Sequence, residues 1–345
     1  MFPPDNQPFR EPYKSSLFVG RLNALNEVEQ WAKAATPQKR LFNIKAPPGY
    51  GKTWLLKEAE RRLAQPGLFP LEANASDLTT PETIAKWLEA KIALAKKNCA
   101  EVRGFDATVA LSQMIRALAE DLCERCYPAY TPIVIVDALD DALEAQARQL
   151  EKLLLEPFWS NNCVRILVAM RDDHRLYSAV LRGGERLFPL TTLSEEDATL
   201  QLQQRASDAE LKTPVPDDLL GIIPPYDWRT PGINSFLSRC AAANREASQP
   251  LLSADDLRAC RRAVIGPQLD NYHDGYLVKL SQLDDTWTED TFAQQCNLTV
   301  SEAGDIAQKF FTLGIVTRPD RVPNRRKIVD GLRELMQAEH KLRSQ

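Results

Sequence analysis

The stretch that decides the fold runs Ala46-Pro47-Pro48-Gly49-Tyr50-Gly51-Lys52-Thr53. A largely apolar run at 41–44 precedes it as a short predicted strand. A predicted helix follows it, with one face formed by Leu55, Leu56, Ala59 and Leu63. A strand, a glycine-rich turn and a helix in this order form a P-loop, the turn that wraps nucleotide phosphates. Ala46 replaces the first glycine of G-x-x-x-x-G-K-[ST]; its methyl group restricts the turn but removes no amide donor.

The chemistry of the motif assigns a role to each part of this turn. Backbone N–H groups of the turn and of the following helix N-terminus point at the β-phosphate. Lys52 brings a positive charge to the β- and γ-phosphates, and the Thr53 hydroxyl ligates Mg²⁺. We expect the nucleotide to contact all of 46–53 and also Trp54. The alternative is a glycine-rich turn that ends in Lys-Thr by chance, and it is weak because a matching acidic strand exists.

That strand is predicted at 132–137 and is followed by further carboxylates. Four consecutive apolar residues, 133–136, indicate a strand buried on both faces of a parallel sheet. Asp137 ends it at the edge where doubly wound sheets bind ligands, and we expect it to hold the Mg²⁺ shell through water. Asp140 or Asp141 could orient or deprotonate the attacking water. The alternative is an acidic helix N-terminus, because the helix dipole favours Asp there.

Composition excludes several classes of protein. The 345 residues are 44% hydrophobic and 26% charged, which is typical of a soluble globular protein of two or three domains. The net charge of −4 does not indicate a nucleic-acid coat. No apolar run approaches a membrane span. Seven cysteines and no apparent signal peptide predict reduced thiols in the cytoplasm. The pair Cys123 and Cys126 has no second pair or nearby His, so zinc is not expected.

The pattern along the chain predicts an α/β domain followed by helices. Residues 1–15 are proline-rich and read as an extended lead, and 16–191 form the nucleotide-binding domain. Its strands are predicted at Leu41–Lys45, Leu68–Glu72, Ile133–Asp137, Arg165–Met170 and Arg186–Leu190. Helical stretches separate them, which predicts a doubly wound parallel sheet. Residues 192–267 read as an all-helical lid, with helices capped at Ser194 and Ser253.

The last segment, 268–345, is predicted to be a winged helix. Its helices are expected at Tyr276–Leu283, from Thr288 to Cys296, and after the capping box that begins at Thr299. The wing strands are expected at 315–316 and 327–328. The third helix carries Glu302 and Asp305 against Lys309, so it is a poor reader of DNA, which needs several cations on the contacting face. The wing is basic, with Arg318, Arg321, Arg325, Arg326 and Lys327. It could contact nucleic acid, an acidic partner or a neighbouring nucleotide domain, and protein packing is favoured.

With these features in order, nearly the whole chain resembles the STAND branch of the AAA+-related ATPases, including the NACHT and AP-ATPase-like modules. Residues 46–53 are close to the G-P-P-G-T-G-K-T form of AAA+ proteins, and 137–141 are similar to the D-G-L-D-E form of NACHT members. The resemblance implies that Arg171 is a sensor arginine that reaches the γ-phosphate. It also implies an adenine pocket lined by an F-V-G-R motif, here Phe18, Val19, Gly20 and Arg21.

Three departures from the family pattern affect what is expected. The lid motif G-L-P is matched by residues 232–234, with Asn234 in place of proline. The M-H-D motif is matched by 328–330, where Val329 cannot donate the hydrogen bond that the family's histidine gives to ADP. Sensor repeats and an effector domain are not found in the sequence. We therefore expect either a piece of a longer protein or a sensor or effector on a separate chain.

The resemblance implies an ATP-binding switch of bacterial signalling or anti-phage defence. ATP or ADP with Mg²⁺ would control self-assembly into a homo-oligomer and the regulation of a partner effector, with slow ATP hydrolysis as the reset. One alternative is a DNA-associated AAA+ ATPase, an origin-recognition-like initiator or a transposition ATPase, that uses the basic wing. A second is a nucleotide-locked scaffold without hydrolysis, which the departures at Ala46, Asn234 and Val329 motivate.

Overall fold

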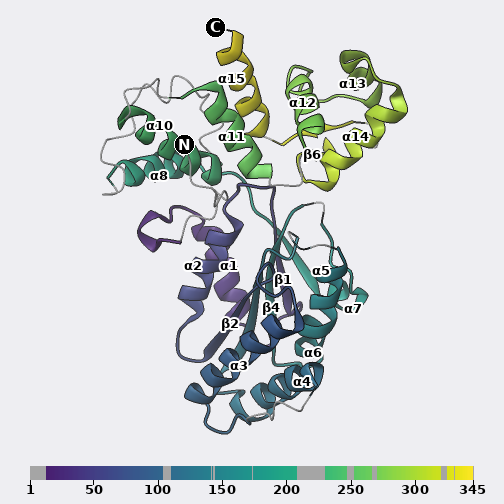
Figure 1. The fold of residues 1–345 in the computed structure, drawn as a ribbon. Helices are drawn as coiled ribbons and strands as arrows, with labels where there is room; N and C mark the ends of the chain where they lie inside the picture. The colour runs from purple at the N-terminus through teal and green to yellow at the C-terminus, as the bar shows by residue number, and fades with distance from the viewer. Residues whose placement is uncertain are drawn as a thin grey trace. The chain divides into compact units, whose positions relative to one another are not determined.

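The computed structural model describes residues 13–103, 110–140, 142, 144–172, 174–207, 230–246, 252–265, 270–319, 325–329 and 331–344. The chain divides into two compact units (Figure 1). The α/β unit comprises Arg21–Ala46 and Lys52–Leu190, and the helical unit comprises Met1–Gly20, Pro47–Gly51 and Thr191–Gln345. None of the described helices combines the length and the apolar character that crossing a membrane requires.

A parallel sheet of five strands forms the centre of the α/β unit. The strands are β1 (Leu41–Lys45), β2 (Leu68–Asn74), β3 (Thr131–Asp137), β4 (Arg165–Met170) and β5 (Glu185–Pro189), in the order β2-β3-β4-β1-β5. Every neighbouring pair is parallel, so the carboxyl ends of β1, β3 and β4 meet at one edge. The apolar runs of β3 and β4 are buried as fully covered strands require. The predicted doubly wound parallel sheet is confirmed.

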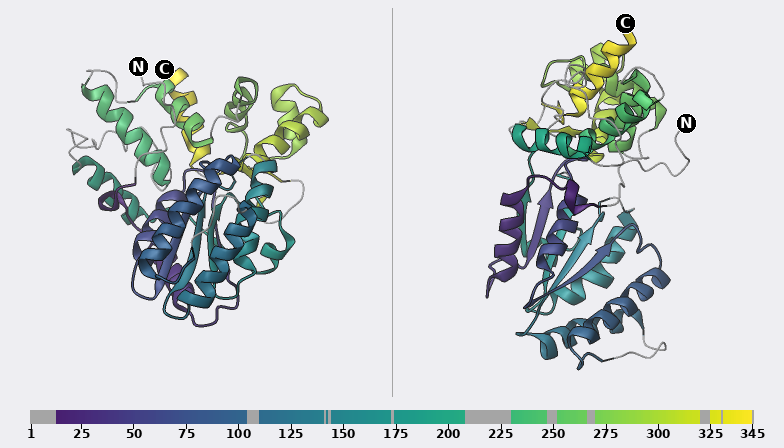
Figure 2. Two further views of the ribbon diagram at one scale, coloured as in Figure 1. Left: turned by 60° about the horizontal axis from the view of Figure 1, so that its bottom comes forward. Right: turned by 90° about the vertical axis from the view of Figure 1, so that its left-hand side faces the viewer.

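Helices cover both faces of this sheet. The helices are α1 (Leu22–Lys33), α2 (Lys52–Leu63), α3 (Pro81–Asn98), α4 (Leu111–Asp121), α5 (Glu144–Leu150), α6 (Glu156–Trp159) and α7 (Ala179–Gly183), with π-helical turns η2 (Leu122–Cys126) and η3 (Glu151–Leu155). Side chains of α3 to α6 share one core with β2, β3 and β4. Helix α1 packs on α2, and α1 lies across the sheet from α3 and α4 (Figure 2, right).

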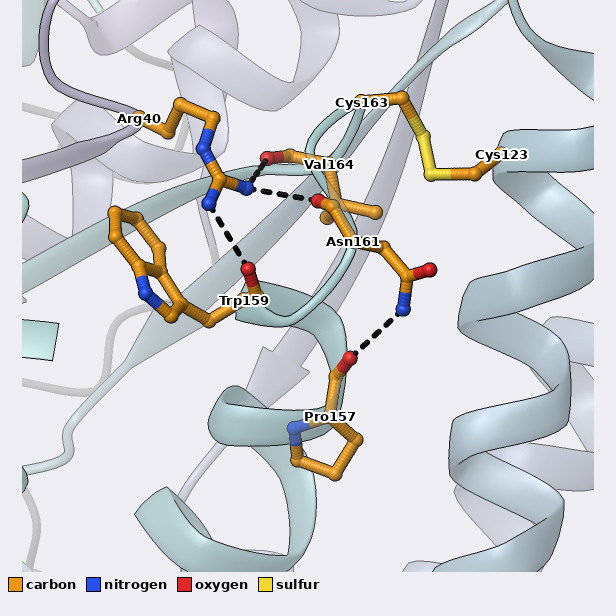
Figure 3. The surroundings of a disulfide bond; sticks show 7 residues. All are labelled: Arg40, Cys123, Pro157, Trp159, Asn161, Cys163 and Val164. Atoms are coloured by element: carbon orange, nitrogen blue, oxygen red, sulfur yellow. Dashed lines mark hydrogen bonds between the residues drawn. A yellow bond between two sulfur atoms is a disulfide. The ribbon is translucent and has the colours of Figure 1, made fainter. Parts of the chain in front are cut away.

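A disulfide in the α/β unit corrects the expectation of reduced thiols. Cys123 of η2 is bonded to Cys163 in the loop before β4, with Cα atoms 5.6 Å apart and a separation of 40 positions in sequence (Figure 3). The other described cysteines form no disulfide: Cys99, Cys126, Cys240, Cys260 and Cys296. A separation of 40 residues gives no sign that the two segments are neighbours in the fold, so the sequence could not reveal the bond.

Arg40 fixes the loop that carries Cys163. Its guanidinium donates to the carbonyl oxygens of Asn161 at 2.8 Å and Trp159 at 3.0 Å. It also lies over the Trp159 ring, 4.1 Å from the ring centroid (Figure 3). The amino end of β4 is therefore held by a disulfide and a cation–π contact, while its carboxyl end leads to Arg171.

The helical unit consists of helices and a two-stranded hairpin. Its elements are η1 (Ser15–Leu17), α8 (Glu195–Ser207), α10 (Pro231–Glu246), α11 (Ala254–Ile265), α12 (Asn271–Leu280), α13 (Glu289–Cys296), α14 (Val300–Thr312), β6 (Val316–Thr317), β7 (Lys327–Ile328) and α15 (Leu332–Ser344). The predicted caps form: Ser194 and Ser253 accept from backbone N–H groups three residues later, and Thr288 and Thr299 make capping boxes. Strands β6 and β7 are antiparallel.

Two elements of this unit, α12 and β6, have bounds that differ from the sequence prediction. Helix α12 begins at Asn271 rather than Tyr276, because the Asp270 carboxylate caps it by accepting from the His273 N–H at 2.8 Å. Strand β6 begins one residue later than expected, at Val316. The order of three helices and a hairpin is the order expected of a winged helix. The assignment of 192–267 as a lid and 268–345 as a winged helix stays a prediction.

A buried charge network joins three helices of this unit. Arg261 of α11 is fully buried and pairs with Asp274 of α12 and with Glu339 of α15, the latter at 2.9 Å. Glu339 also pairs with Arg258 at 3.5 Å and with Arg343 at 2.8 Å. Because an isolated charge in the interior is costly, such groups persist only when they are paired. The network therefore ties α11, α12 and α15 together.

Candidate nucleotide site

The turn between β1 and α2 has the backbone conformation that the motif requires. Gly49 and Gly51 have φ values of +81° and +83°, a region that favours glycine strongly. Ala46 still follows the strand: its N–H donates to the Met170 carbonyl oxygen at 3.2 Å and its side chain is buried. Ala46 is not among the residues with positive φ. A methyl group is therefore tolerated at the position of the first glycine.

Three residues predicted to contact phosphate and metal come together in the α/β unit. Lys52 begins α2, and its Nζ donates to the Ala46 carbonyl oxygen at 2.9 Å across the base of the turn. The Thr53 hydroxyl donates a hydrogen bond to the carboxylate of Asp137 at the end of β3. Thr53 as a residue is exposed, whereas Asp137 is buried. The two predicted Mg²⁺ ligands are in contact, and Lys52 lies beside them.

The Asp137 carboxylate is poorly solvated. Its residue is 8% exposed, and burial raises its pKa to about 6; the charge of Asp140 also raises it, while the Thr53 hydrogen bond and Lys52 lower it. A desolvated carboxylate next to a hydroxyl is an oxygen donor set that suits Mg²⁺. Over the described ranges, no three His, Cys, Asp or Glu side chains gather as metal ligands. At nucleotide sites Mg²⁺ is usually held by one or two carboxylates together with phosphate oxygens and water.

Two further predicted catalytic residues, Asp140 and Arg171, lie at the same edge of the sheet. Asp140 follows β3 and Arg171 follows β4, and the Asp140 Oδ2 accepts the Arg171 backbone N–H at 2.7 Å. The Arg171 Nε lies 3.5 Å from the same oxygen. Asp141 lies outside the described residues. The sequence thus identified an acidic and a basic group that meet, although it assigned them separate roles.

Two of the four residues of the predicted adenine motif have a left-handed backbone conformation. Gly20 and Arg21 have φ values of +69° and +64°, so the chain turns sharply before α1. A Cβ atom at Gly20 would lie 2.6 Å from the Asp197 Oδ2 of α8, which explains why a glycine occupies this position. Val19 is buried, and Phe18 packs edge-on to Tyr13. No structural observation tests their contact with adenine, nor that of Trp54, and both stay predictions.

Within the helical unit, the turn 47–51 packs against the start of α10. The Gly232 N–H donates to the Gly49 carbonyl oxygen at 2.8 Å. A Cβ atom at Gly51 would lie 3.6 Å from the Pro231 side chain. Asn234, which the sequence placed at the lid proline position, is instead fully buried and donates to the Gln201 Oε1 at 3.0 Å. The proline that contacts the turn is Pro231, which sequence reasoning missed; a proline at the first position of a helix was the available signal.

The wing cations are largely engaged within the chain. Arg326 is buried and pairs with Glu289 at 2.8 Å, and Lys327 pairs with Asp285 at 3.4 Å. The Arg318 guanidinium lies over the Phe311 ring. Arg325 is exposed, and Arg321 lies outside the described residues. The predicted basic wing is therefore much less available to an external anion than its sequence indicates. Val329 donates its backbone N–H to the Ile315 carbonyl oxygen at 2.9 Å, and its apolar side chain is buried.

Comparison with known proteins agrees with this fold. Residues 36–188, which include the P-loop, Asp137 and Arg171, match the AAA domain family. The α/β unit has the P-loop AAA fold. No curated protein matches the chain.

Several solved structures are similar at low identity. Cdc6p from Pyrobaculum aerophilum is 14% identical, with 98% of this chain and 97% of that one covered and a TM-score of 0.47. A STAND protein with a tetratricopeptide repeat sensor from Pyrococcus horikoshii is 14% identical, with 95% and 43% covered and a TM-score of 0.42. The RuvB Holliday junction branch migration motor of Thermotoga maritima is 14% identical, with 93% and 96% covered and a TM-score of 0.43. These similarities do not distinguish between the activities of the three proteins.

Proposed function

We propose that this chain is an ATP-binding molecular switch of the STAND type. The observation that supports it best is the meeting of Lys52, Thr53 and Asp137 at the carboxyl edge of the sheet, next to a turn with the P-loop conformation. Lys52 would leave the Ala46 carbonyl and move to the β- and γ-phosphates. Thr53 and Asp137 would hold Mg²⁺, which neutralises charge on the phosphates.

The turn gives this site a route to the helical unit. Gly49 is bonded to the first turn of α10 through its carbonyl oxygen, while the same segment leads directly into Lys52 and α2. A triphosphate and a diphosphate would make different contacts with the backbone of the turn. Each would therefore favour a different packing of α10 against the turn. A ligand shifts such an equilibrium only by its difference in affinity for the two states. The favoured state with ATP would assemble and engage a partner, and slow hydrolysis would reset it.

The first alternative is a DNA-associated AAA+ ATPase. Binding to DNA requires several cations that can reach phosphates. The engagement of Arg326, Lys327 and Arg318 by neighbouring side chains supports protein packing of the wing over this role. The similar structures include proteins of both kinds and give no preference. Salt-sensitive DNA binding that is lost when Arg325 is neutralised would favour the alternative.

Calorimetry with ADP and with a slowly hydrolysed ATP analogue in Mg²⁺ tests the site itself. Lys52→Ala removes the phosphate-facing charge, so affinity for the analogue should fall at least about tenfold, or roughly 1.4 kcal/mol. Lys33→Ala is the matched control, because Lys33 lies in the last turn of α1 and forms an exposed pair with Glu29 of the same helix. Equal affinity in wild type and Lys52→Ala would show that the P-loop assignment is wrong.

Light scattering on a sizing column tests the switch. The analogue with Mg²⁺ should convert wild type, but not Lys52→Ala, into a larger defined species, whereas ADP should not. If nucleotide binds but the mass is the same in every condition, the second alternative, a nucleotide-locked scaffold, is favoured. Single-turnover phosphate release would then decide whether ATP is hydrolysed at all.

A further inference from the structure

Asp140 and Arg171 form a buried pair at the ends of two neighbouring strands. Their side chains are 4% and 11% exposed. The Asp140 Oδ2 receives the Arg171 backbone N–H at 2.7 Å and lies 3.5 Å from the Arg171 Nε. One carboxylate oxygen therefore holds both the main chain and the guanidinium of the residue that follows β4.

The chain is shaped to bring Asp140 to this position. Ala138 directly after β3 has a φ of +58°, a conformation that costs an alanine about 1 kcal/mol or more. The turn returns the chain to the interior, where Leu139 is fully buried and Asp140 reaches the start of the segment after β4. Backbone strain next to a candidate site indicates that the position of Asp140 matters.

We propose that Asp140 is a positioning residue that sets Arg171 for the γ-phosphate, rather than the group that activates the attacking water. This inference rests on the proposed function of the site. The Asp140 Oδ2 accepts the Arg171 backbone N–H and is ion-paired with its guanidinium, and the side chain is 4% exposed, so this carboxylate is engaged with Arg171 rather than turned to solvent water. The backbone hydrogen bond and the ion pair fix the direction in which the Arg171 side chain leaves the end of β4. A guanidinium is the group that recognises phosphate oxygens with the most specific geometry.

The pair also separates the roles of the two carboxylates at this edge. The charge of Asp140 is opposed by Arg171 at short range, whereas Asp137 is hydrogen-bonded by the neutral Thr53 hydroxyl. A cation is therefore drawn to Asp137, and the anionic γ-phosphate is drawn to the arginine that Asp140 holds.

The test compares affinity for the triphosphate analogue with affinity for ADP, by calorimetry in Mg²⁺. If Asp140 positions Arg171, then Asp140→Asn and Arg171→Ala should each reduce the preference for the triphosphate by about tenfold, the usual effect of losing one charge-assisted hydrogen bond. The double variant should be no worse than Arg171→Ala alone, because both changes remove the same contact. Asp140→Asn retains an oxygen that can accept the Arg171 N–H, which protects the fold.

Asp121→Asn is the matched control. Asp121 is also buried, and it accepts the Arg103 backbone N–H at 2.8 Å and the Arg125 Nε at 3.0 Å. It should lower thermal stability without changing the triphosphate preference. If Asp140→Asn leaves the preference unchanged while single-turnover hydrolysis falls, Asp140 is a base and the inference is overturned.

Failure of the inference can be told from failure of the proposed function. If wild type binds and distinguishes the two nucleotides, loses binding with Lys52→Ala, and is unaffected in preference by Asp140→Asn, only the inference fails. If wild type binds neither nucleotide, both fail together. If it binds both equally, Arg171 does not sense the γ-phosphate and the inference is overturned.

Discussion

Each unit of the molecule holds an arginine against buried carboxylates, and the two cases differ in charge balance. In the helical unit, Arg261 is fully buried between Asp274 and Glu339, and Glu339 is also paired with Arg258 and Arg343. In the α/β unit, Arg171 pairs with Asp140, and close by lies Asp137 with its raised pKa.

The difference shows how a structural network is told from a ligand site. Both regions bury charge, so burial of charge alone does not mark function. In the helical unit every carboxylate of the network meets an arginine from another part of the chain. At the sheet edge, Asp137 is desolvated and stabilised by a neutral hydroxyl and the nearby Lys52. Such an imbalance is what a bound cation would correct.

The largest expected effect comes from breaking the helical network. Arg261→Met should lower the free energy of unfolding by about 3–5 kcal/mol, because Asp274 and Glu339 lose the fully buried cation that lies between them. Urea denaturation measures it. The control is Arg343→Met, whose arginine is 40% exposed in its side chain and whose loss should cost at most about 1 kcal/mol. A loss below about 1 kcal/mol for Arg261→Met would show that the network does not hold α11, α12 and α15 together.

The disulfide lies at the amino end of β4, whereas the candidate nucleotide site lies at its carboxyl end, so a change at Cys163 should affect stability alone. Cys163→Ser should lower the free energy of unfolding by about 2–4 kcal/mol under oxidising conditions, because the closed loop restricts the unfolded chain. Reductant should bring wild type to the stability of the variant. Nucleotide affinity should not change, because Cys163 precedes β4 and Arg171 follows it. A wild type that is insensitive to reductant, with seven reactive thiols after unfolding, would contradict the bond.

The dependence of folding stability on pH tests whether Asp137 is the desolvated carboxylate of the sheet edge. Folding raises its pKa from 3.8 to about 6. A raised acid pKa stabilises the fold through the protonated form, so this contribution is present below pH about 4 and is lost as pH rises through about 6. A tenfold change in an acid dissociation constant corresponds to about 1.4 kcal/mol, so the effect is a few kcal/mol at most. Unfolding of wild type and Asp137→Asn at several pH values measures it as their difference.

Binding of Mg²⁺ with nucleotide should show the opposite trend. The metal requires the ionised carboxylate, so affinity should rise between about pH 5 and 7 in wild type. Asp137→Asn should lose the part of the rise that comes from ionisation of Asp137. It should retain the part that comes from deprotonation of the nucleotide phosphates. Identical pH profiles for both proteins would remove Asp137 from the metal site.

The sequence predicted the sheet well because its signals are local. Strands β1 and β4 have the bounds that their apolar runs indicated, and the P-loop glycines have the left-handed φ values that their residue type favours. Pairings between distant segments could not be read in this way. Neither the Cys123–Cys163 bond nor the engagement of the wing cations has a local signature, and the Asp140–Arg171 contact depends on the order of β3 and β4 in the sheet.

Helix α10 shows the same limit on a smaller scale. A motif comparison aligned Asn234 with the family's proline, whereas Pro231 lies against the turn in the structure. The motif places its proline by position along the chain, but the contact with the turn depends on the residue at which α10 begins. The proline at its first position was a physical signal for that start, and it carried more information than the alignment.

The smallest expected effect on stability comes from relieving backbone strain at Ala138, which lies between β3 and Asp140. Ala138 has a φ of +58°. Ala138→Gly removes a steric cost of about 1–2 kcal/mol but increases the entropy of the unfolded chain by about 0.5–1 kcal/mol, so stability should rise by roughly 0.5 kcal/mol. Ala90→Gly, on the exposed face of α3, is the same substitution in a helix and should lower stability by about 1 kcal/mol. Opposite signs in thermal unfolding would show that the turn before Asp140 is strained. Equal losses at both positions would mean that Ala138 adopts its conformation without cost, and the argument that strain places Asp140 beside Arg171 would have to be given up.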